Sequence, residues 1–171
     1  MLDKIIMTLL MLNCAFVAIA QSPPATEDEF EKQYQKRIKM DHLNGVYIPK
    51  DLADCFIRLD ELIDKDSKVK FKNMDEKDAA TKLHFSFGRW MIYNWGFYEG
   101  SRLSFYLKNL GVSHPDDMAQ FITITYHRNL KKEKLNVKEL IDYYKEKLEK
   151  KKKERLEQGE VIFEETRKRE N

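Results

Sequence analysis

Residues 49–64 read PKDLADCFIRLDELID, and this stretch decides the class of fold. Its apolar side chains recur at three- and four-residue intervals: Leu52, Cys55, Phe56, Leu59, Leu62 and Ile63. Acidic side chains occupy positions between them, so one face of a helix is apolar and the other is charged. Pro49 is expected to start this helix. The backbone N–H groups of the first helical turn have no partner within the helix, so the N–H that proline lacks is not needed there. The stretch therefore predicts an amphipathic helix that contributes one face to a core.

The composition of the whole chain favours further helices. The chain has 171 residues, of which 42% are hydrophobic and 35% are charged, and this suits one core with charged helical surfaces. It contains only 6 glycines and 4 prolines, too few turn residues for a fold of many short strands. We predict an all-α fold, namely a single compact bundle of about four to five helices with helical N- and C-terminal extensions.

Helix-start and helix-end signals locate the other expected helices. Asp75 is the expected cap of a helix whose apolar positions are Ala80, Leu83, His84, Phe87, Trp90, Met91 and Asn94. Ser101 is expected to cap a short helix that ends at Gly111 in a left-handed conformation. Residues 65–73 are expected to form a polar connector anchored by Val69 and Phe71.

The segment 121–126 (FITITY) carries conflicting signals. Its alternating, β-branched side chains suit a strand. A strong helix start precedes it at residues 113–117 (SHPDD), however, and no turn signal occurs before Leu130. We therefore expect this segment to be helical, and we expect one more helix to begin near Asn136.

The first twenty residues are typical of a cleavable export signal. Lys4 precedes an apolar run from Ile5, and small residues at Ala18 and Ala20 suit signal peptidase cleavage before Gln21. The run is shorter than the roughly 20 apolar residues that a membrane span needs. We expect a periplasmic or secreted protein, with anchoring through an uncleaved N-terminus or a lipidated Cys14 as the alternatives.

Cleavage at this site leaves Cys55 as the only cysteine, so the domain has no intrachain disulfide. Cys55 lies on the apolar stripe and is expected to be a small buried hydrophobic residue. The predicted organisation is a signal peptide at 1–20, a leader with a loosely docked helical arm at 21–46, a compact helical domain at 47–144 and a charged helical extension at 145–171. Residues 145–155 hold seven basic and three acidic side chains, which suit either a solvated helix or an arm for an anionic partner.

A dense aromatic block provides the main candidate for a binding site. Five aromatic side chains lie within residues 90–98, and Gly100, Ser101 and Arg102 follow directly. A helix start at Ser101 offers free N–H groups, and an arginine fork suits carboxylate or phosphate. We therefore name as candidate ligand-binding residues Trp90, Asn94, Trp95, Ser101 and Arg102. Such a face suits an anionic or sugar-like ligand; the alternative is that the rings form core and Arg102 a structural ion pair.

Histidines and carboxylates supply the competing hypothesis of a small exported enzyme. His114, Asp117 and His127 are candidate acid–base residues, hydrolase-like in kind and possible metal ligands, and His84 would complete a zinc set. Their spacing matches no known metal or nucleophile motif, and no phosphate-binding loop or Cys-x-x-Cys occurs. We therefore expect no metal and no cofactor, and a non-catalytic binding module is the preferred hypothesis.

Several of these motifs together resemble an uncharacterised bacterial family, catalogued as domain of unknown function 6794. The resemblance runs from about Tyr47 to Tyr144 and rests on five segments: Ile48-Pro49, Trp90…Asn94-Trp95-Gly96, Gly100-Ser101-Arg102-Leu103, His114-Pro115-Asp116-Asp117-Met118 and Tyr126-His127-Arg128. It implies one compact helical domain and no particular reaction.

The expected partner is a protein or cell-envelope ligand of unknown identity. The net charge is +2, from 31 basic and 29 acidic residues, which is too balanced to indicate nucleic acid. We expect no integral membrane span after signal cleavage.

Overall fold

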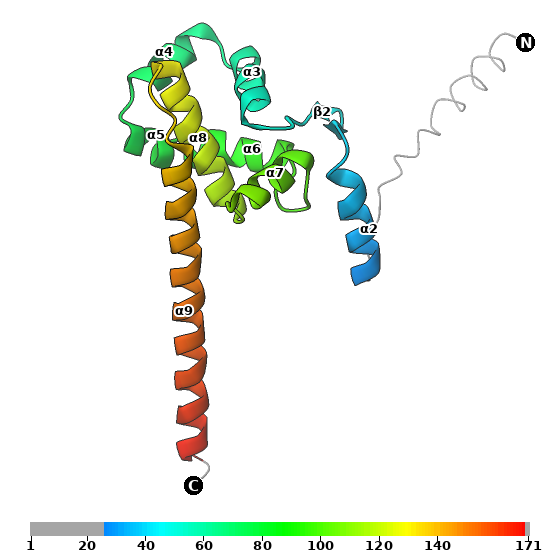
Figure 1. Cartoon of the computed structure of the whole chain (residues 1–171), viewed down its shortest axis with the longest axis vertical. Helices are drawn as coiled ribbons and strands as arrows, with labels where there is room; N and C mark the ends of the chain where they lie inside the picture. The colour runs from blue at the N-terminus through cyan, green and yellow to red at the C-terminus, as the bar shows by residue number, and fades with distance from the viewer. Residues whose placement is uncertain (1–25, 170–171) are drawn as a thin grey trace, which may run out of the picture. The chain divides into compact units, whose positions relative to one another are not determined.

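The computed structural model describes the backbone of residues 26–169 and the side chains of residues 26–157. The predicted signal peptide, residues 1–20, lies outside the described residues. Contacts divide the chain into two units, residues 1–31 and 32–171, and the boundary falls within the first described helix. In chain order (Figure 1) the elements are α2 (Glu27–Arg37), β1 (His42–Leu43), β2 (Val46–Tyr47), α3 (Leu52–Leu62), α4 (Lys65–Asn73), α5 (Glu76–Lys82), the π-helix η1 (His84–Gly88), α6 (Arg89–Asn94), α7 (Arg102–Leu110), α8 (Pro115–Lys131) and α9 (Val137–Arg169).

The predicted all-α class is confirmed, with one small β-hairpin added. In this hairpin His42 pairs with Tyr47 and Leu43 with Val46 in antiparallel register. Asn44 and Gly45 join the strands with φ values of 50° and 78°, the left-handed pair that tight hairpin turns require. This segment was predicted to belong to a helical arm, although an Asn-Gly dipeptide is itself a hairpin signal.

Helix α3 forms as predicted but begins later than expected. Asp51, not Pro49, caps it, because the Asp51 carboxylate accepts the N–H of Asp54 at 2.8 Å. Its apolar face buries Leu52, Cys55 and Leu59. Pro49 is buried before the helix, so its expected position in the first helical turn was wrong.

The expected connector at residues 65–73 is instead a helix, α4. Asp64 caps it by accepting the N–H of Ser67 at 2.9 Å, and no glycine or proline interrupts it. Its amphipathic pattern is weak because only Phe71 is buried, while Val69 remains 57% exposed. The cap signal was present in the sequence, but a single buried ring gives no readable stripe.

The helix expected from Asp75 to Asn94 is divided by a π-helical turn. The Gly88 N–H bonds to the carbonyl of Leu83, and that of Arg89 bonds to His84, so the ladder spans five residues here. A Cβ at Gly88 would lie 3.2 Å from His84 Nδ1 and 3.8 Å from the Ala119 methyl group, so the backbone runs close to both. The wide turn thus separates α5 from α6, and both helices contact α8.

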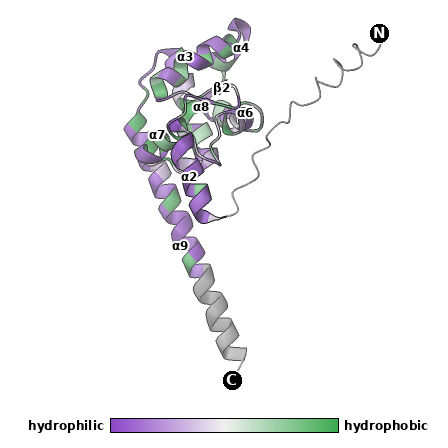
Figure 2. Ribbon diagram, turned by 90° about the vertical axis from the view of Figure 1, so that its right-hand side faces the viewer, coloured by the Kyte–Doolittle hydropathy of each residue, from purple (hydrophilic) through white to green (hydrophobic). Residues whose placement is uncertain are grey.

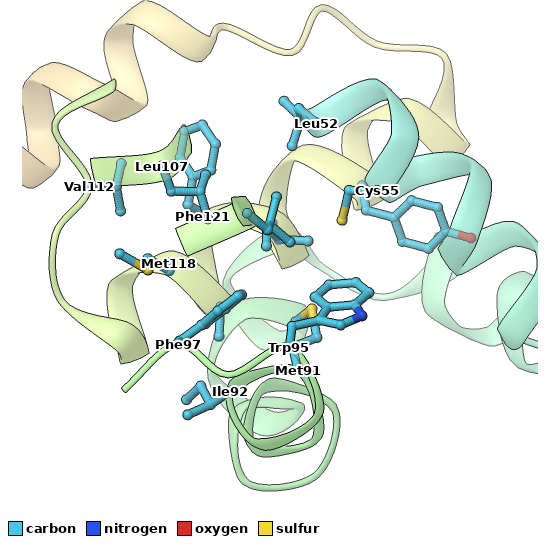
Figure 3. Close-up of a cluster of buried hydrophobic side chains, with 14 of the residues drawn as sticks. Leu52, Cys55, Met91, Ile92, Trp95, Phe97, Leu107, Val112, Met118 and Phe121 are labelled. Atoms are coloured by element: carbon cyan, nitrogen blue, oxygen red, sulfur yellow. The ribbon is translucent and has the colours of Figure 1, made fainter. Parts of the chain in front are cut away.

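Helix α8 is the centre of the domain and contacts α3, α4, α5, α6, α7 and α9. It buries Phe121, Ile122, Thr123, Thr125 and Tyr126, so the predicted helix over residues 121–126 is confirmed. The two threonine hydroxyls donate to the carbonyls of Ala119 and Phe121 at 2.8 Å, which satisfies them inside the core. Figure 3 shows Phe121 within the buried cluster, near Cys55 and Leu107.

Within its described side chains, helix α9 packs on α8 through its first turns. Tyr144 is 2% exposed, its ring lies 6.3 Å from that of Phe121, and its hydroxyl is hydrogen-bonded to Gln120. Lys147 adds an ion pair with Asp117 at 2.6 Å. Beyond this point the described residues of α9 are mostly hydrophilic (Figure 2). Across residues 26–169, no helix combines the length and the apolar character needed to span a membrane.

The end of α2 is held more firmly than the sparse apolar pattern of the arm predicts. Arg37 Nε donates to the carbonyl of Gly100 at 3.0 Å. Gly100 has a φ of +92°, and a side chain there would overlap the Tyr34 ring, so the ring rests directly on the backbone. The Lys108 ammonium lies 5.0 Å from the centre of the same ring. These contacts fix the loop between α6 and α7 to the arm.

Candidate functional site

The aromatic block at residues 90–98 divides into a buried part and an exposed part. Trp95 and Phe97 are fully buried and belong to the core cluster (Figure 3), with their ring centres 6.3 Å apart. Tyr93 and Tyr98, in contrast, are 86% and 65% exposed. The excess of rings that the sequence shows is therefore only partly explained by core packing.

Arg102 and Ser101, predicted to bind a ligand, are used inside the domain. Arg102 Nε donates to the carbonyl of Ile48 at 2.6 Å, and its guanidinium lies 5.0 Å from the centre of the Tyr47 ring. Ser101 is fully buried and forms a capping box with Ser104 at the start of α7. Arg102 therefore attaches α7 to the rest of the domain, and Ser101 stabilises the start of the helix.

The other predicted ligand-binding residues also have partners within the chain. Asn94 donates to the carbonyl of Trp90 at 2.9 Å, and the ring of Trp90 meets that of Trp95 edge-on at 5.5 Å. Trp95 is inaccessible from the surface. These contacts give no support to a ligand face formed by the five residues, and their binding role stays a prediction.

A pocket of about 420 Å³ lies next to the predicted block, where the exposed rings gather. Its apolar wall consists of Phe85 on η1, Ile92 and Tyr93 on α6, and Tyr98 in the loop before α7. Phe85 is 78% exposed, although a fully solvated phenylalanine ring is unfavourable. Three large exposed rings at one pocket are typical of a binding surface rather than of a bare helix face.

The π turn sets the position of these rings. Phe85, Arg89 and Tyr93 follow one another at four-residue intervals along η1 and α6, and all three are exposed. Residues four apart lie near one another on a helix surface. Ile92, 7% exposed, lines the pocket and also belongs to the core cluster. π turns inside helices occur often at functional sites, and this one carries the pocket.

The polar wall of the pocket is formed by His84, Arg89, Glu99 and Asp116. Both carboxylates have basic neighbours: Asp116 lies 3.3 Å from His84 Nε2, and Glu99 lies 3.7 Å from Arg37. Arg89 differs, because among the described residues no carboxylate or carbonyl is paired with its guanidinium. The pocket therefore presents one exposed guanidinium whose charge has no partner within that part of the chain.

The three residues of the alternative polar cluster each have a different partner. His114 caps α8, with Nδ1 facing the N–H and the carboxylate of Asp116, and Asp117 pairs with Lys147. His127 is fully buried, and its Nε2 lies 3.0 Å from the carbonyl of Met74. In the described part of the chain, no hydrogen bond or ion pair connects any two of the three residues. Their contacts thus give the acid–base hypothesis no geometric support.

Metal and thiol chemistry are likewise without a site in the described region. Within it, no group of three or more His, Cys, Asp or Glu side chains lies close enough to hold a metal ion. Cys55 is fully buried, and burial raises the pKa of its thiol well above the usual value. The expectation that Cys55 is a small core residue is confirmed.

The sequence reasoning missed Phe85 and Arg89, because both lie off the apolar stripe of a regular helix. Phe85 gave one usable signal, a large apolar ring at a position that the stripe leaves exposed. Arg89 gave none, since an isolated surface arginine is ordinary. Tyr93 and Tyr98 were part of the aromatic block, but the sequence did not indicate that they are exposed while Trp95 is buried.

The fold and the site together define the class of protein. It is a single helical domain with a small hairpin and a surface pocket, and its described residues form no recognisable catalytic arrangement. Residues 48–130 match the family model described as a domain of unknown function (DUF6794). This confirms the resemblance, over a range that ends earlier than Tyr144. No curated protein and no solved structure matches the chain significantly.

Proposed function

We propose that this chain is an exported, non-catalytic binding module and that its ligand occupies the pocket around Tyr93. One observation carries the proposal: Phe85, Tyr93 and Tyr98 expose large rings at the same pocket, beside the Arg89 guanidinium, which has no partner among the described residues. Exposed rings with a few polar groups are the usual composition of a ligand site. The ligand is a protein or a component of the cell envelope.

Export is proposed from the first twenty residues, whose charged start, apolar run and small residues before Gln21 resemble a signal peptide. The site of action is then the periplasm or the cell exterior. The non-catalytic assignment is supported because His114, Asp117 and His127 each contact a different partner. No observation favours a specific reaction.

Co-sedimentation with cell envelope isolated from the source organism tests the proposal. A triple variant (Phe85→Ala, Tyr93→Ala, Tyr98→Ala) removes the exposed rings without emptying the core. A matched control, Tyr143→Ala, removes a ring that is 56% exposed on α9, away from the pocket. We expect the native chain and the control to bind, and the triple variant to lose binding by about tenfold or more, because buried aromatic anchors dominate binding energies.

Equal sedimentation of the triple variant and the native chain contradicts the assignment of the pocket. Failure of the native chain to bind any envelope fraction contradicts the binding module itself. A ligand recovered in chemically altered form contradicts the non-catalytic assignment.

A further inference from the structure

The pocket differs in chemistry from an apolar hollow lined by residues of α4 and η1, and the difference points to a type of ligand. The second hollow has a volume of about 270 Å³ and is lined almost wholly by apolar groups, including Phe71, Met74, Leu83 and Phe87. Such a surface suits the apolar side chain of a protein partner. The pocket around Tyr93 instead alternates rings with charged and hydrogen-bonding groups, so it suits a ligand that is both polar and flat.

The three rings of the pocket are separate platforms. No ring pair among Phe85, Tyr93 and Tyr98 lies within stacking distance in the described structure, where the ring partner of Phe85 is His84, edge-on at 5.4 Å. Each ring therefore has a face available to a ligand, and the set suits an extended molecule with several flat units. Within the same described region, neither tyrosine hydroxyl is hydrogen-bonded, so each is free to donate to a ligand hydroxyl.

The charged groups of the pocket indicate which of these molecules suits it best. Glu99 lies beside the Arg37 guanidinium and Asp116 lies beside the rings of His84 and His114, whereas no carboxylate among the described residues pairs with the Arg89 guanidinium. A guanidinium offers a planar pair of donors that matches a carboxylate or a phosphate. An anionic group at Arg89 would therefore supply the missing counter-charge of the pocket.

Backbone geometry disfavours an extended peptide as the ligand. The walls of the pocket are η1, α6 and the loop before α7, and the hairpin strands of the domain do not line it. The pocket therefore offers no strand edge for the main-chain pairing by which extended peptides often bind. Sugars need no such edge, because they present an apolar ring face and a rim of hydroxyls.

We propose that the pocket binds an anionic saccharide, with sugar rings stacked on Tyr93 and Tyr98 and the carboxylate or phosphate of the sugar on Arg89. The proposal rests on the proposed function, because it assigns a ligand to the same pocket. Phe85 contacts the next sugar unit along the chain. Asp116 and Glu99 accept hydrogen bonds from sugar hydroxyls at the rim.

Calorimetric titration of the protein isolated from its own cells tests this assignment. The probes are short oligouronates of the gluco, galacto, manno and gulo series, their fully methyl-esterified counterparts, and a set of sugar phosphates. We expect at least one acidic saccharide to bind. Its neutral counterpart, which is the methyl ester or the dephosphorylated sugar, should bind about tenfold more weakly, because it lacks one charge-assisted hydrogen-bonded contact. Binding of an oligouronate assigns a carboxylate to Arg89, and binding of a sugar phosphate assigns a phosphate.

Variants connect that preference to Arg89. Arg89→Met should lower the affinity for the acidic saccharide about tenfold and leave the affinity for its neutral counterpart unchanged, so that the preference disappears. Arg89→Lys should restore only part of it, since lysine lacks the fork. The matched control Arg155→Met removes an exposed cation on α9 and should change neither affinity.

The outcomes separate this inference from the proposed function. If no uronate or sugar phosphate binds while the envelope still binds through the aromatic rings, the saccharide assignment is wrong and the binding module stands. Retained preference in Arg89→Met overturns the role of Arg89. Displacement by an acidic peptide at lower concentration than by any saccharide assigns the pocket to a peptide and overturns the inference.

Discussion

Replacement of Gly100 by alanine tests how firmly the N-terminal arm is attached to the domain. An alanine at a φ of +92° costs about 1–2 kcal/mol by itself. Its Cβ would also overlap the Tyr34 ring and displace it. Tyr34 is half-buried, which is worth about 1 kcal/mol, and its contact with Lys108 adds about 0.5 kcal/mol. The expected loss in the free energy of unfolding is therefore about 3 kcal/mol.

Two comparisons separate the backbone cost from the loss of arm docking. Gly45→Ala, at a φ of +78° with no atom within 4 Å of the new Cβ, should cost only the backbone part, about 1–2 kcal/mol. In a Tyr34→Ala background, Gly100→Ala should cost about the same as Gly45→Ala, with a coupling of about 1–1.5 kcal/mol. Urea titration gives all four values. An equal cost for Gly100→Ala with and without Tyr34 refutes the docking of the arm.

Three further predictions concern the core and the N-terminus. Arg128→Met removes a two-bond ion pair with Glu76 and a hydrogen bond to the Leu135 carbonyl, and urea titration should show a loss of about 2 kcal/mol. The hydrogen bond from Arg128 lowers the pKa of Glu76, so the stability that the pair contributes is present above the unfolded pKa of 4.5 and is lost as the pH falls through the folded pKa. The variant should therefore lose less stability than the native chain on acidification. An equal pH dependence of the two would count against the pair. Cys55 should react with a thiol reagent only on unfolding, because its thiol is buried and its pKa is raised; rapid labelling of the native protein would contradict the packing. Intact-mass analysis of native material should give a chain that begins at Gln21, whereas a chain that retains Met1 would exclude cleavage.

Local hydrogen-bond chemistry was predictable from the sequence. The caps at Asp75 and Ser101, the left-handed end at Gly111 and the start at His114-Pro115 are all confirmed, because each depends on atoms within a few residues. The helix over 121–126 was also predictable, since its start signal lies directly before it. These signals were enough to establish the fold class.

Features that depend on tertiary packing were not predictable in the same way. The π turn places Gly88 against the methyl group of Ala119, which is far away in sequence. Arg102 carries a signal for anion binding, yet its Nε donates to Ile48, a partner 54 positions earlier. The same limit applies to the aromatic block, because its sequence gives the number of rings but not which of them are covered by α8.

Amide chemical-shift mapping of the isotope-labelled protein with its envelope ligand tests the central claim most directly. The account predicts that the perturbed amides gather at Phe85, Arg89, Tyr93 and Tyr98, and that the ligand is recovered unchanged. Perturbations centred on the apolar hollow at Phe71, or conversion of the ligand to a product, would contradict it.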